Sequence, residues 1–267
     1  MTDATTHAGS LPSGSRYVVE DPEHWNGVLV LFSHPVPVRP GEPPWETDEP
    51  LIGHLVRSGY AVAGSANTIF WPLELVLSDH PDLLDVAEGI LGPPRHTISA
   101  GVSIGGIISA GRVQRFPERL SGALPMCGNL AGAVGIHNRE LDIAFVVKTL
   151  LAAGSTLQPV HITDAKANLD VSLAVLHEAQ ETPAGRARLA LAAAMGNVPG
   201  WYHAASNEPA PDDVEARQRG QFDWFEHISF LVFFWAREQV ERQAGGNPSW
   251  NTEVDYRQLL AVSINRE

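Results

Sequence analysis

The stretch HTISAGVSIGG, which runs from His96 to Gly106, decides the fold. Its first half is a short apolar run that predicts a buried strand, and the residues from Ile104 to Phe116 predict a helix. Between them, Gly101-Val102-Ser103-Ile104-Gly105 matches the pattern G-x-S-x-G. A strand that runs directly into a helix at this pattern predicts a sharp turn that lifts the Ser103 hydroxyl above the sheet.

The glycines of this turn have a physical reason, because side chains beside such a bend would clash. Glycine is common in the chain, at 24 of 267 residues, so the pattern counts mainly through its position between a strand and a helix. In the functional interpretation Ser103 is a nucleophile, and the N–H of Ile104 at the helix N-terminus stabilises a developing oxyanion. A glycine-rich turn with an idle serine is the alternative.

On both sides of this turn, short apolar runs alternate with helix-like segments, which is the order typical of an α/β sheet. Residues 27–32, 60–64 and 120–127 predict further buried strands, and a shorter strand is expected around residues 17–19. Six prolines between residues 35 and 50 predict a loop. The sequence therefore predicts an α/β fold with a mostly parallel sheet and flanking helices.

After Gly128 the pattern changes to helices alone. Residues 138–153, 166–180, 183–196 and 212–243 all predict helices, with no convincing strand between them. A helical block inserted after a sheet is commonly a cap over an active site.

This pattern divides the chain into four segments. We expect a flexible leader at residues 1–15, an α/β core at 16–128, a helical cap at 129–244 and a segment at 245–267 that returns toward the core. Nine aromatic residues fall within 35 positions of the expected cap, and they predict either packing of the cap against the body of the fold or an apolar pocket wall for an acyl or aromatic substrate. They are Trp201, Tyr202, Phe222, Trp224, Phe225, Phe230, Phe233, Phe234 and Trp235.

Composition narrows the classes of function. A formal net charge of −13 without clustered Lys and Arg argues against a nucleic-acid partner, and the longest apolar stretch is too short to span a bilayer. The polar N-terminus lacks the features of a secretory signal, so a cytoplasmic location is expected. Cys127 is the single cysteine, follows a predicted buried strand and is expected to be packed. No metal-binding spacing, dinucleotide fingerprint or phosphate-binding loop occurs, so neither a metal nor a cofactor is expected.

The chain resembles actinobacterial α/β-hydrolase-fold serine hydrolases, which are related to esterases. The resemblance runs through residues 28–34, 59–65, the Ser103 turn, 116–128 and 246–252, and covers nearly all of the chain after the leader. It implies an α/β-hydrolase fold with a helical cap, a nucleophilic Ser103, a small apolar or acyl substrate, and a chain able to form a homo-oligomer.

Two departures from this family bear on the chemistry. The family usually places glycine after the strand that ends at His34, where a backbone N–H completes the oxyanion hole, but here Pro35 has no N–H. Val36 could donate in its place, or the loop could have no such role. The family order is also nucleophile, acid, histidine, and no late motif for the last two is present before Glu267. We therefore expect the C-terminal strands of the fold to be missing from this sequence.

A serine hydroxyl is a poor nucleophile without a base, so the source of the base decides the function. His34 is expected to brace the loop beside it, while His80, His161, His203 and His227 are bases only if the fold brings them near Ser103.

Three explanations stay open: a fragment of a longer enzyme, a base supplied by another histidine or chain, or a protein that has lost hydrolysis. The leading hypothesis is a serine hydrolase or acyl-transfer enzyme acting on an ester or thioester. The alternative is a non-hydrolytic, cyclase-like or ligand-binding member of the fold.

Overall fold

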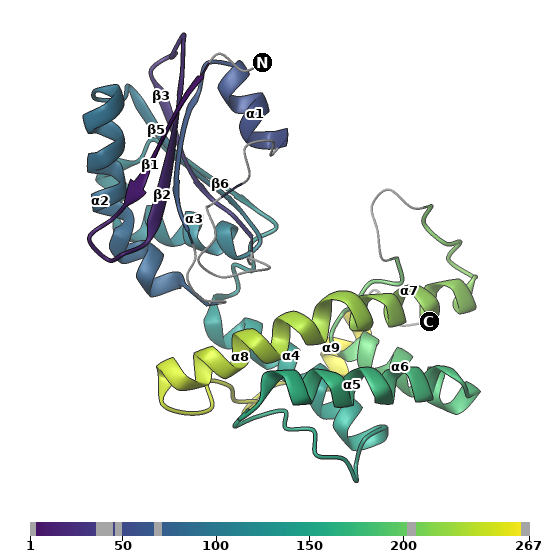
Figure 1. Cartoon of the computed structure of the whole chain (residues 1–267). Coiled ribbons are helices and arrows are strands. Elements are labelled where there is room, and N and C mark those ends of the chain that lie inside the picture. The colour runs from purple at the N-terminus through teal and green to yellow at the C-terminus, as the bar shows by residue number, and fades with distance from the viewer. Residues whose placement is uncertain (1–3, 36–44, 46–49, 67–70, 202–206, 263–267) are drawn as a thin grey trace. The chain divides into compact units, whose positions relative to one another are not determined.

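The computed structural model describes residues 4–35, 45, 50–66, 71–201 and 207–262. It consists of two compact units (Figure 1), which we call the α/β unit (Met1–Leu130) and the helical unit (Ala131–Glu267). The change from alternating strands and helices to helices alone therefore falls close to residue 128, where the sequence pattern changes. Each unit has its own hydrophobic core.

The α/β unit is built around a six-stranded sheet with the strand order β1-β2-β4-β3-β5-β6. Strands β4, β3, β5 and β6 are parallel, whereas β1 and β2 join the sheet antiparallel. The elements are β1 (Ala4–Ser10), β2 (Arg16–Pro22), β3 (Val28–Ser33), α1 (Pro50–Arg57), β4 (Ala61–Ser65), α2 (Leu73–Leu91), β5 (His96–Val102), α3 (Ile104–Arg115), a 3-10 turn (Pro117–Arg119) and β6 (Gly122–Met126). The predicted α/β class with a mostly parallel sheet is confirmed.

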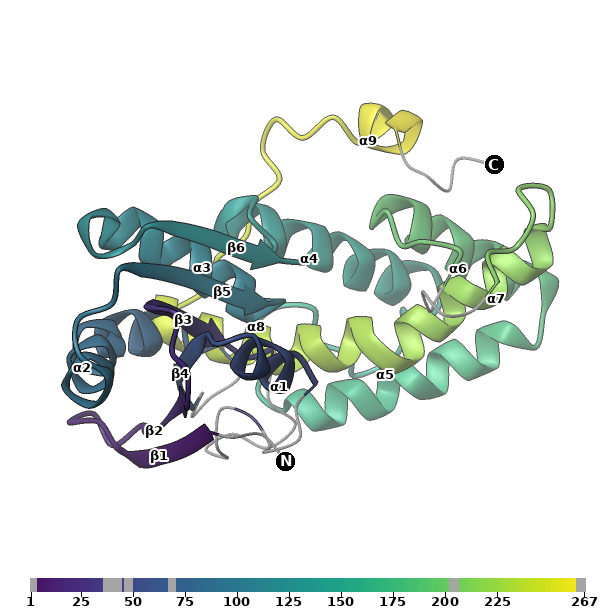
Figure 2. The ribbon, with the colours of Figure 1, turned by 90° about the horizontal axis from the view of Figure 1, so that it is seen from above.

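The apolar run of β3 shows how the sheet is covered on both faces. Leu29 and Leu31 pack in a cluster that includes residues of α2, while Val30 and Phe32 pack in a second cluster with residues of α1. Figure 2 shows α1 and α2 against the same sheet. A strand with both faces buried is apolar at consecutive positions, which is why this run could be predicted from the sequence.

The prediction of a flexible leader at residues 1–15 is wrong. Ala4–Ser10 form strand β1, which pairs with β2 in continuous register from Ala4 opposite Pro22 to Ser10 opposite Arg16. The stretch ATTHAGS lacks the apolar alternation that marks a half-buried strand, because most of its side chains are half-buried or exposed at the edge of the sheet. Backbone hydrogen bonds to β2, together with the bond from Thr6 Oγ1 to Glu20 at 2.7 Å, hold it in place.

The helical unit contains no strand in the described part of the chain. Its elements are α4 (Gly132–Leu150), α5 (Ala165–Gln180), α6 (Pro183–Met195), α7 (Val214–Trp224), a π-helical turn (Phe225–Ser229), α8 (Phe230–Ala244) and α9 (Tyr256–Val262). Side-chain caps begin three of them: Asp164 accepts from the N–H of Ala167, Thr182 from that of Gly185 and Asp213 from that of Ala216. These caps satisfy N–H groups that the first helical turn leaves unpaired.

Most of the aromatic residues predicted to pack the cap or to line a pocket form the core of the helical unit. Phe222, Phe225, Phe230, Phe233 and Phe234 are buried in one cluster, and Trp224 and Trp235 pack against it. The rings of Phe230 and Phe234 stack with centroids 5.5 Å apart. Tyr202 lies outside the described residues. The clustered side chains pack within the helical unit itself, and the packing of a cap against the α/β body stays a prediction. Within the described residues, no helix combines the length and apolar character needed to cross a membrane.

Polar side chains are buried between α2, α3 and the sheet. The ring of His80 stacks on Phe116 at 4.6 Å, and neither ring nitrogen has a hydrogen-bond partner among the described residues. Arg112 is fully buried and donates from Nη1 to the carbonyl of Leu31 at 3.2 Å. Burial, with the cations of Arg112 and Arg119 nearby, lowers the pKa of His80 from 6.5 to about 3. The folded α/β unit thus holds a neutral imidazole.

Because the folded state holds His80 neutral, we expect the protein to lose stability in mild acid. The pKa of His80 is lower in the folded state than in the unfolded chain. The contribution of the neutral ring to the free energy of unfolding is therefore complete above pH 6.5 and is lost as the pH falls toward 3. The free energy of unfolding should fall between pH 7 and 5 by about 2 kcal/mol more in the wild type than in His80→Phe. Urea unfolding at the two pH values measures the difference. His54→Gln, at an exposed histidine of α1, should behave as wild type, and an equal fall in His80→Phe would contradict the prediction.

Candidate active site

The turn between β5 and α3 holds Ser103 in a strained backbone conformation. Its φ of 57° and ψ of −118° lie outside the regions that residues with a side chain ordinarily adopt. The N–H of Ser103 donates to the carbonyl of Met126 at 2.9 Å, which fixes the turn to the end of β6. The residue is exposed to solvent, and its hydroxyl forms no hydrogen bond with described residues. The predicted strand–turn–helix geometry is therefore present.

The glycines around Ser103 are required by close backbone contacts. A Cβ atom at Gly105 would lie 2.0 Å from the carbonyl oxygen of Ser33, and one at Gly101 would lie 2.2 Å from that of Gly105. Both distances are shorter than any real contact of a Cβ atom. The start of α3 can thus approach the ends of β3 and β5 only with glycine at both positions, which keeps the turn tight and the hydroxyl at its outer edge.

The first residue of α3 provides a backbone donor beside Ser103. The N–H of Ile104 has no acceptor among the described residues, while its side chain is buried at 4% exposure. An unpaired N–H at a helix N-terminus favours negative charge, both as a donor and through the helix dipole. The second expected donor, Val36, lies outside the described residues, so its role as part of an oxyanion hole stays a prediction.

Several polar side chains gather where the parallel strands end. Ser33 ends β3 opposite Gly101 of β5, and Ser65 ends β4. The hydroxyls of Ser33 and Ser65 are buried without a hydrogen-bond partner in the described part of the chain. Because the carboxyl ends of parallel strands meet at one edge of the sheet, these groups and Ser103 share that edge, where open α/β sheets ordinarily bind ligands.

His34 follows β3 at the same edge. Its Nδ1 donates to the carbonyl of Pro35 at 2.7 Å, and the side chain is largely buried. Burial lowers the pKa of His34, and the hydrogen bond to the Pro35 carbonyl partly offsets this shift. The ring is thus bound to its own loop, and the bracing role expected from the sequence stays a prediction.

The other histidines considered as bases are not brought to this edge by the α/β unit. His80 is packed on Phe116, at the far end of α3 from Ser103. His161 and His227 belong to the helical unit, and His203 lies outside the described residues. The Nε2 atom of His177, also in the helical unit, lies 2.8 Å from Glu226. The described residues of the α/β unit therefore assign no general base to Ser103.

Cys127 differs from the expectation that it is packed. It is exposed and has a φ of 52°, directly after Met126 at the end of β6. The apolar sequence of β6 suggested a buried strand, but its side chains are half-buried or exposed, with Leu124 at 54% exposure. In the described residues β6 pairs on one side only, with β5, so its residues lack the cover that a central strand receives. No group of side chains suited to a metal ion occurs among the described residues.

A curated amidase is similar to nearly all of this chain. The chain is 29% identical to an o-phthalyl amidase of Xanthobacter agilis over 279 aligned positions, which cover 94% of this chain and 60% of the relative. It thus spans 60% of the length of the curated relative that it matches. No family model matches the chain.

Among solved structures, three esterases or serine hydrolases illustrate the similarity. FphF, a fluorophosphonate-binding serine hydrolase of Staphylococcus aureus, is 15% identical with a TM-score of 0.39, covering 48% of this chain and 57% of its own. An acetyl xylan esterase from Aspergillus awamori is 14% identical with a TM-score of 0.37, covering 45% and 50%. An esterase of Pyrococcus furiosus is 9% identical with a TM-score of 0.42, covering 56% of each chain. The fold class rests on the strand order and the Ser103 turn themselves.

The contacts of Gly105 predict a sharp response to one added methyl group. Gly105→Ala should lower the free energy of unfolding by about 2 kcal/mol, because the methyl group overlaps the Ser33 carbonyl and the turn must shift. Denaturant unfolding measures the loss.

The matched control is Gly89→Ala on α2. A Cβ atom there meets no described atom within 4 Å, so this variant should be unchanged or up to about 1 kcal/mol more stable. Equal stabilities of the two variants would show that the turn does not depend on a glycine at position 105.

Proposed function

We propose that this chain carries the nucleophilic serine of a hydrolase that cleaves a carboxylic ester or amide bond. The observation that carries the proposal is the conformation of Ser103: a strained, exposed residue between β5 and α3, with the unpaired N–H of Ile104 beside it. Backbone strain is retained where the surrounding structure holds it, and such residues cluster at active sites. Here the packing of Gly101 and Gly105 against neighbouring backbone holds it.

In the proposed reaction the Ser103 oxygen attacks the substrate carbonyl carbon while its proton passes to a general base. The carbonyl oxygen gains negative charge and is stabilised by the N–H of Ile104, and Val36 is proposed as the second donor. Collapse of the tetrahedral intermediate expels an alcohol or amine, which takes up the proton, and leaves an acyl group on Ser103. A water molecule, deprotonated by the same base, then releases the carboxylic acid and restores the serine.

The similarity to one relative extends the proposed substrates from esters and thioesters to amides. The o-phthalyl amidase is named for an amidase activity on an aromatic acyl group, and its similarity extends over 94% of this chain. Serine hydrolases attack esters and amides by the same route, so the relative widens the class of scissile bond without changing the role of Ser103. The sequence predicts an apolar or acyl substrate, and the relative is named for an aromatic acyl group. We therefore propose a small substrate with an aromatic or otherwise apolar acyl group.

A second candidate function is non-hydrolytic binding or catalysis on the same fold. The observation that favours it is the Ser103 hydroxyl itself, which forms no hydrogen bond with a histidine in the described part of the chain. A serine without a base reacts slowly with carbonyl groups. In that case ligands would stabilise the protein, Ser103→Ala would bind them equally well, and no ester or amide would be turned over.

A fluorophosphonate probe tests the leading proposal directly. The wild-type chain should be labelled covalently on Ser103, and Ser103→Ala should lose essentially all of the labelling because the attacking oxygen is removed. In-gel detection of the probe, with mass spectrometry of the labelled peptide, measures both.

Ser58→Ala removes another exposed hydroxyl of the α/β unit and should be labelled like the wild type. Equal labelling of wild type and Ser103→Ala, or an unlabelled wild type, would refute the nucleophilic role. Ligand stabilisation without labelling would favour the second candidate.

A further inference from the structure

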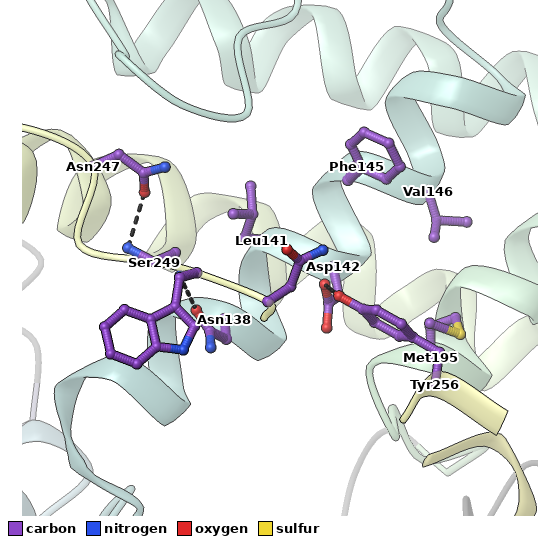
Figure 3. A pocket seen from close by; sticks show the side chains of 11 residues that line it. Asn138, Leu141, Asp142, Phe145, Val146, Met195, Asn247, Ser249 and Tyr256 are labelled. Carbon is purple, nitrogen blue, oxygen red and sulfur yellow. Dashed lines mark hydrogen bonds between the residues drawn. The ribbon is translucent and has the colours of Figure 1, made fainter. Parts of the chain in front are cut away.

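A cavity of about 390 Å³ is lined by residues of the helical unit. Figure 3 shows α4 on one side of it and the segment that follows α8 on the other. This volume is in the range of pockets that hold small molecules. The cavity is lined by Asn138, Leu141, Asp142, Phe145, Val146, Met195, Asn247, Ser249, Trp250, Asn251 and Tyr256.

One wall of the cavity is held by a buried arginine. Arg237 is fully buried on α8 and donates to Asn247 Oδ1 at 2.6 Å and to Ser249 Oγ at 2.8 Å. Its charge is balanced by Glu241, at 3.0 Å from Nε. The carboxylate of Glu241 also accepts the N–H groups of residues 161 and 162. The segment after α8 is thus tied to the core rather than resting loosely over the cavity.

Backbone contacts complete this wall. The side chain of Asn138 on α4 accepts the N–H of Trp250 at 2.9 Å, and Asn247 Oδ1 accepts that of Ser249 at 2.9 Å (Figure 3). The amide oxygens of Asn138 and Asn247 and the hydroxyl of Ser249 are therefore already engaged within the protein. The lining of this side is formed in advance of any ligand, which lowers the entropic cost of binding.

Two large aromatic side chains at the cavity are open to solvent. Phe145 on α4 is 60% exposed and Trp250 is 68% exposed. Leu141, Val146 and Met195 add further apolar surface to the lining. Exposed apolar surface at a cavity favours a ligand with an aromatic or other apolar body, which would remove that surface from water.

One charged side chain lines the cavity. Asp142 accepts the hydroxyl of Tyr256 on Oδ1 at 2.9 Å, while Oδ2 has no hydrogen-bond partner among the described residues. No lysine, arginine or histidine is among the lining residues that the structure describes. Burial raises the pKa of Asp142, against the hydrogen bond from Tyr256, which lowers it. A cation near Oδ2 would stabilise the charged carboxylate that burial disfavours.

We propose that this cavity binds a small molecule with an aromatic body and a cationic amine, the ring against Phe145 and the ammonium group on Asp142, one turn away on α4. A carboxylate accepts several hydrogen bonds, so Tyr256 leaves room for an ammonium donor. A charge-assisted bond of this kind is stronger than one to a neutral donor. Carboxylate or phosphate ligands are disfavoured, because their charge would meet Asp142 with no cation among the described lining residues.

Three probes of one shape test the proposal on the whole chain: 2-phenylethylamine, 2-phenylethanol and phenylacetate. Isothermal titration should show that the amine binds about tenfold or more tightly than the alcohol, and that phenylacetate binds least. The order depends on the group that meets Asp142, since the ring is the same in all three. Similar affinities for amine and alcohol in the wild type, or no binding of the amine, would overturn the proposal without any variant.

Variants then assign the two parts of the site. Asp142→Asn keeps an acceptor for Tyr256 and should bring the amine to the affinity of the alcohol, whereas Phe145→Ala should weaken both probes alike. Asp170→Asn removes the same charge from an exposed position on α5 and should leave the preference unchanged. An amine preference that survives Asp142→Asn in a folded protein, checked by circular dichroism, would overturn the role of the carboxylate.

This inference does not rest on the proposed hydrolase function. The amine should bind Ser103→Ala and wild type with equal affinity, because the lining residues all belong to the helical unit. Fluorophosphonate labelling of Ser103 should in turn be unaffected by Asp142→Asn. Failure of the labelling and failure of amine binding are therefore separate results.

Discussion

The close approach of the start of α3 to the ends of β3 and β5 is the constraint on which the candidate active site depends. At Gly105 the backbone passes so near the Ser33 carbonyl that no side chain fits. This contact forces the chain to turn within one residue, and that residue, Ser103, takes a positive φ. The same turn exposes the hydroxyl and leaves the N–H of Ile104 unpaired. The exposed Ser103 hydroxyl and the unpaired N–H of Ile104, the proposed nucleophile and oxyanion donor, are thus consequences of one packing requirement.

The sheet is what makes this requirement stable. The residues of β3 from Leu29 to Phe32 pack alternately on the two faces of the sheet, with Leu31 toward α2 and Phe32 toward α1. Slipping the strand by one residue would exchange the two faces, so the register that places Ser33 opposite Gly101 is well determined. Burial of apolar side chains holds the strands, and the strands hold the strained turn.

The helical unit uses a buried ion pair for a comparable purpose. Arg237 and Glu241 lie one turn apart on α8, and together they bind the segments around residues 161 and 247. A buried charge that loses its partner is costly, so these segments are held strongly in place. The aromatic core fills the interior of the unit, whereas two exposed aromatic residues, Phe145 and Trp250, line the cavity.

Local pattern in the sequence determined the strands from β2 to β6, the helices that follow them and the turn at Ser103, because apolar periodicity and glycine spacing are set by neighbours along the chain. It could not show β1, whose polar residues are held by backbone bonds to β2, or the exposure of Cys127, which depends on β6 pairing on one side in the described residues. No pattern in the sequence indicated that Asp142 and Tyr256 lie together at a cavity. They are distant in sequence, and only folding brings the carboxylate and the hydroxyl to 2.9 Å at the wall of a cavity.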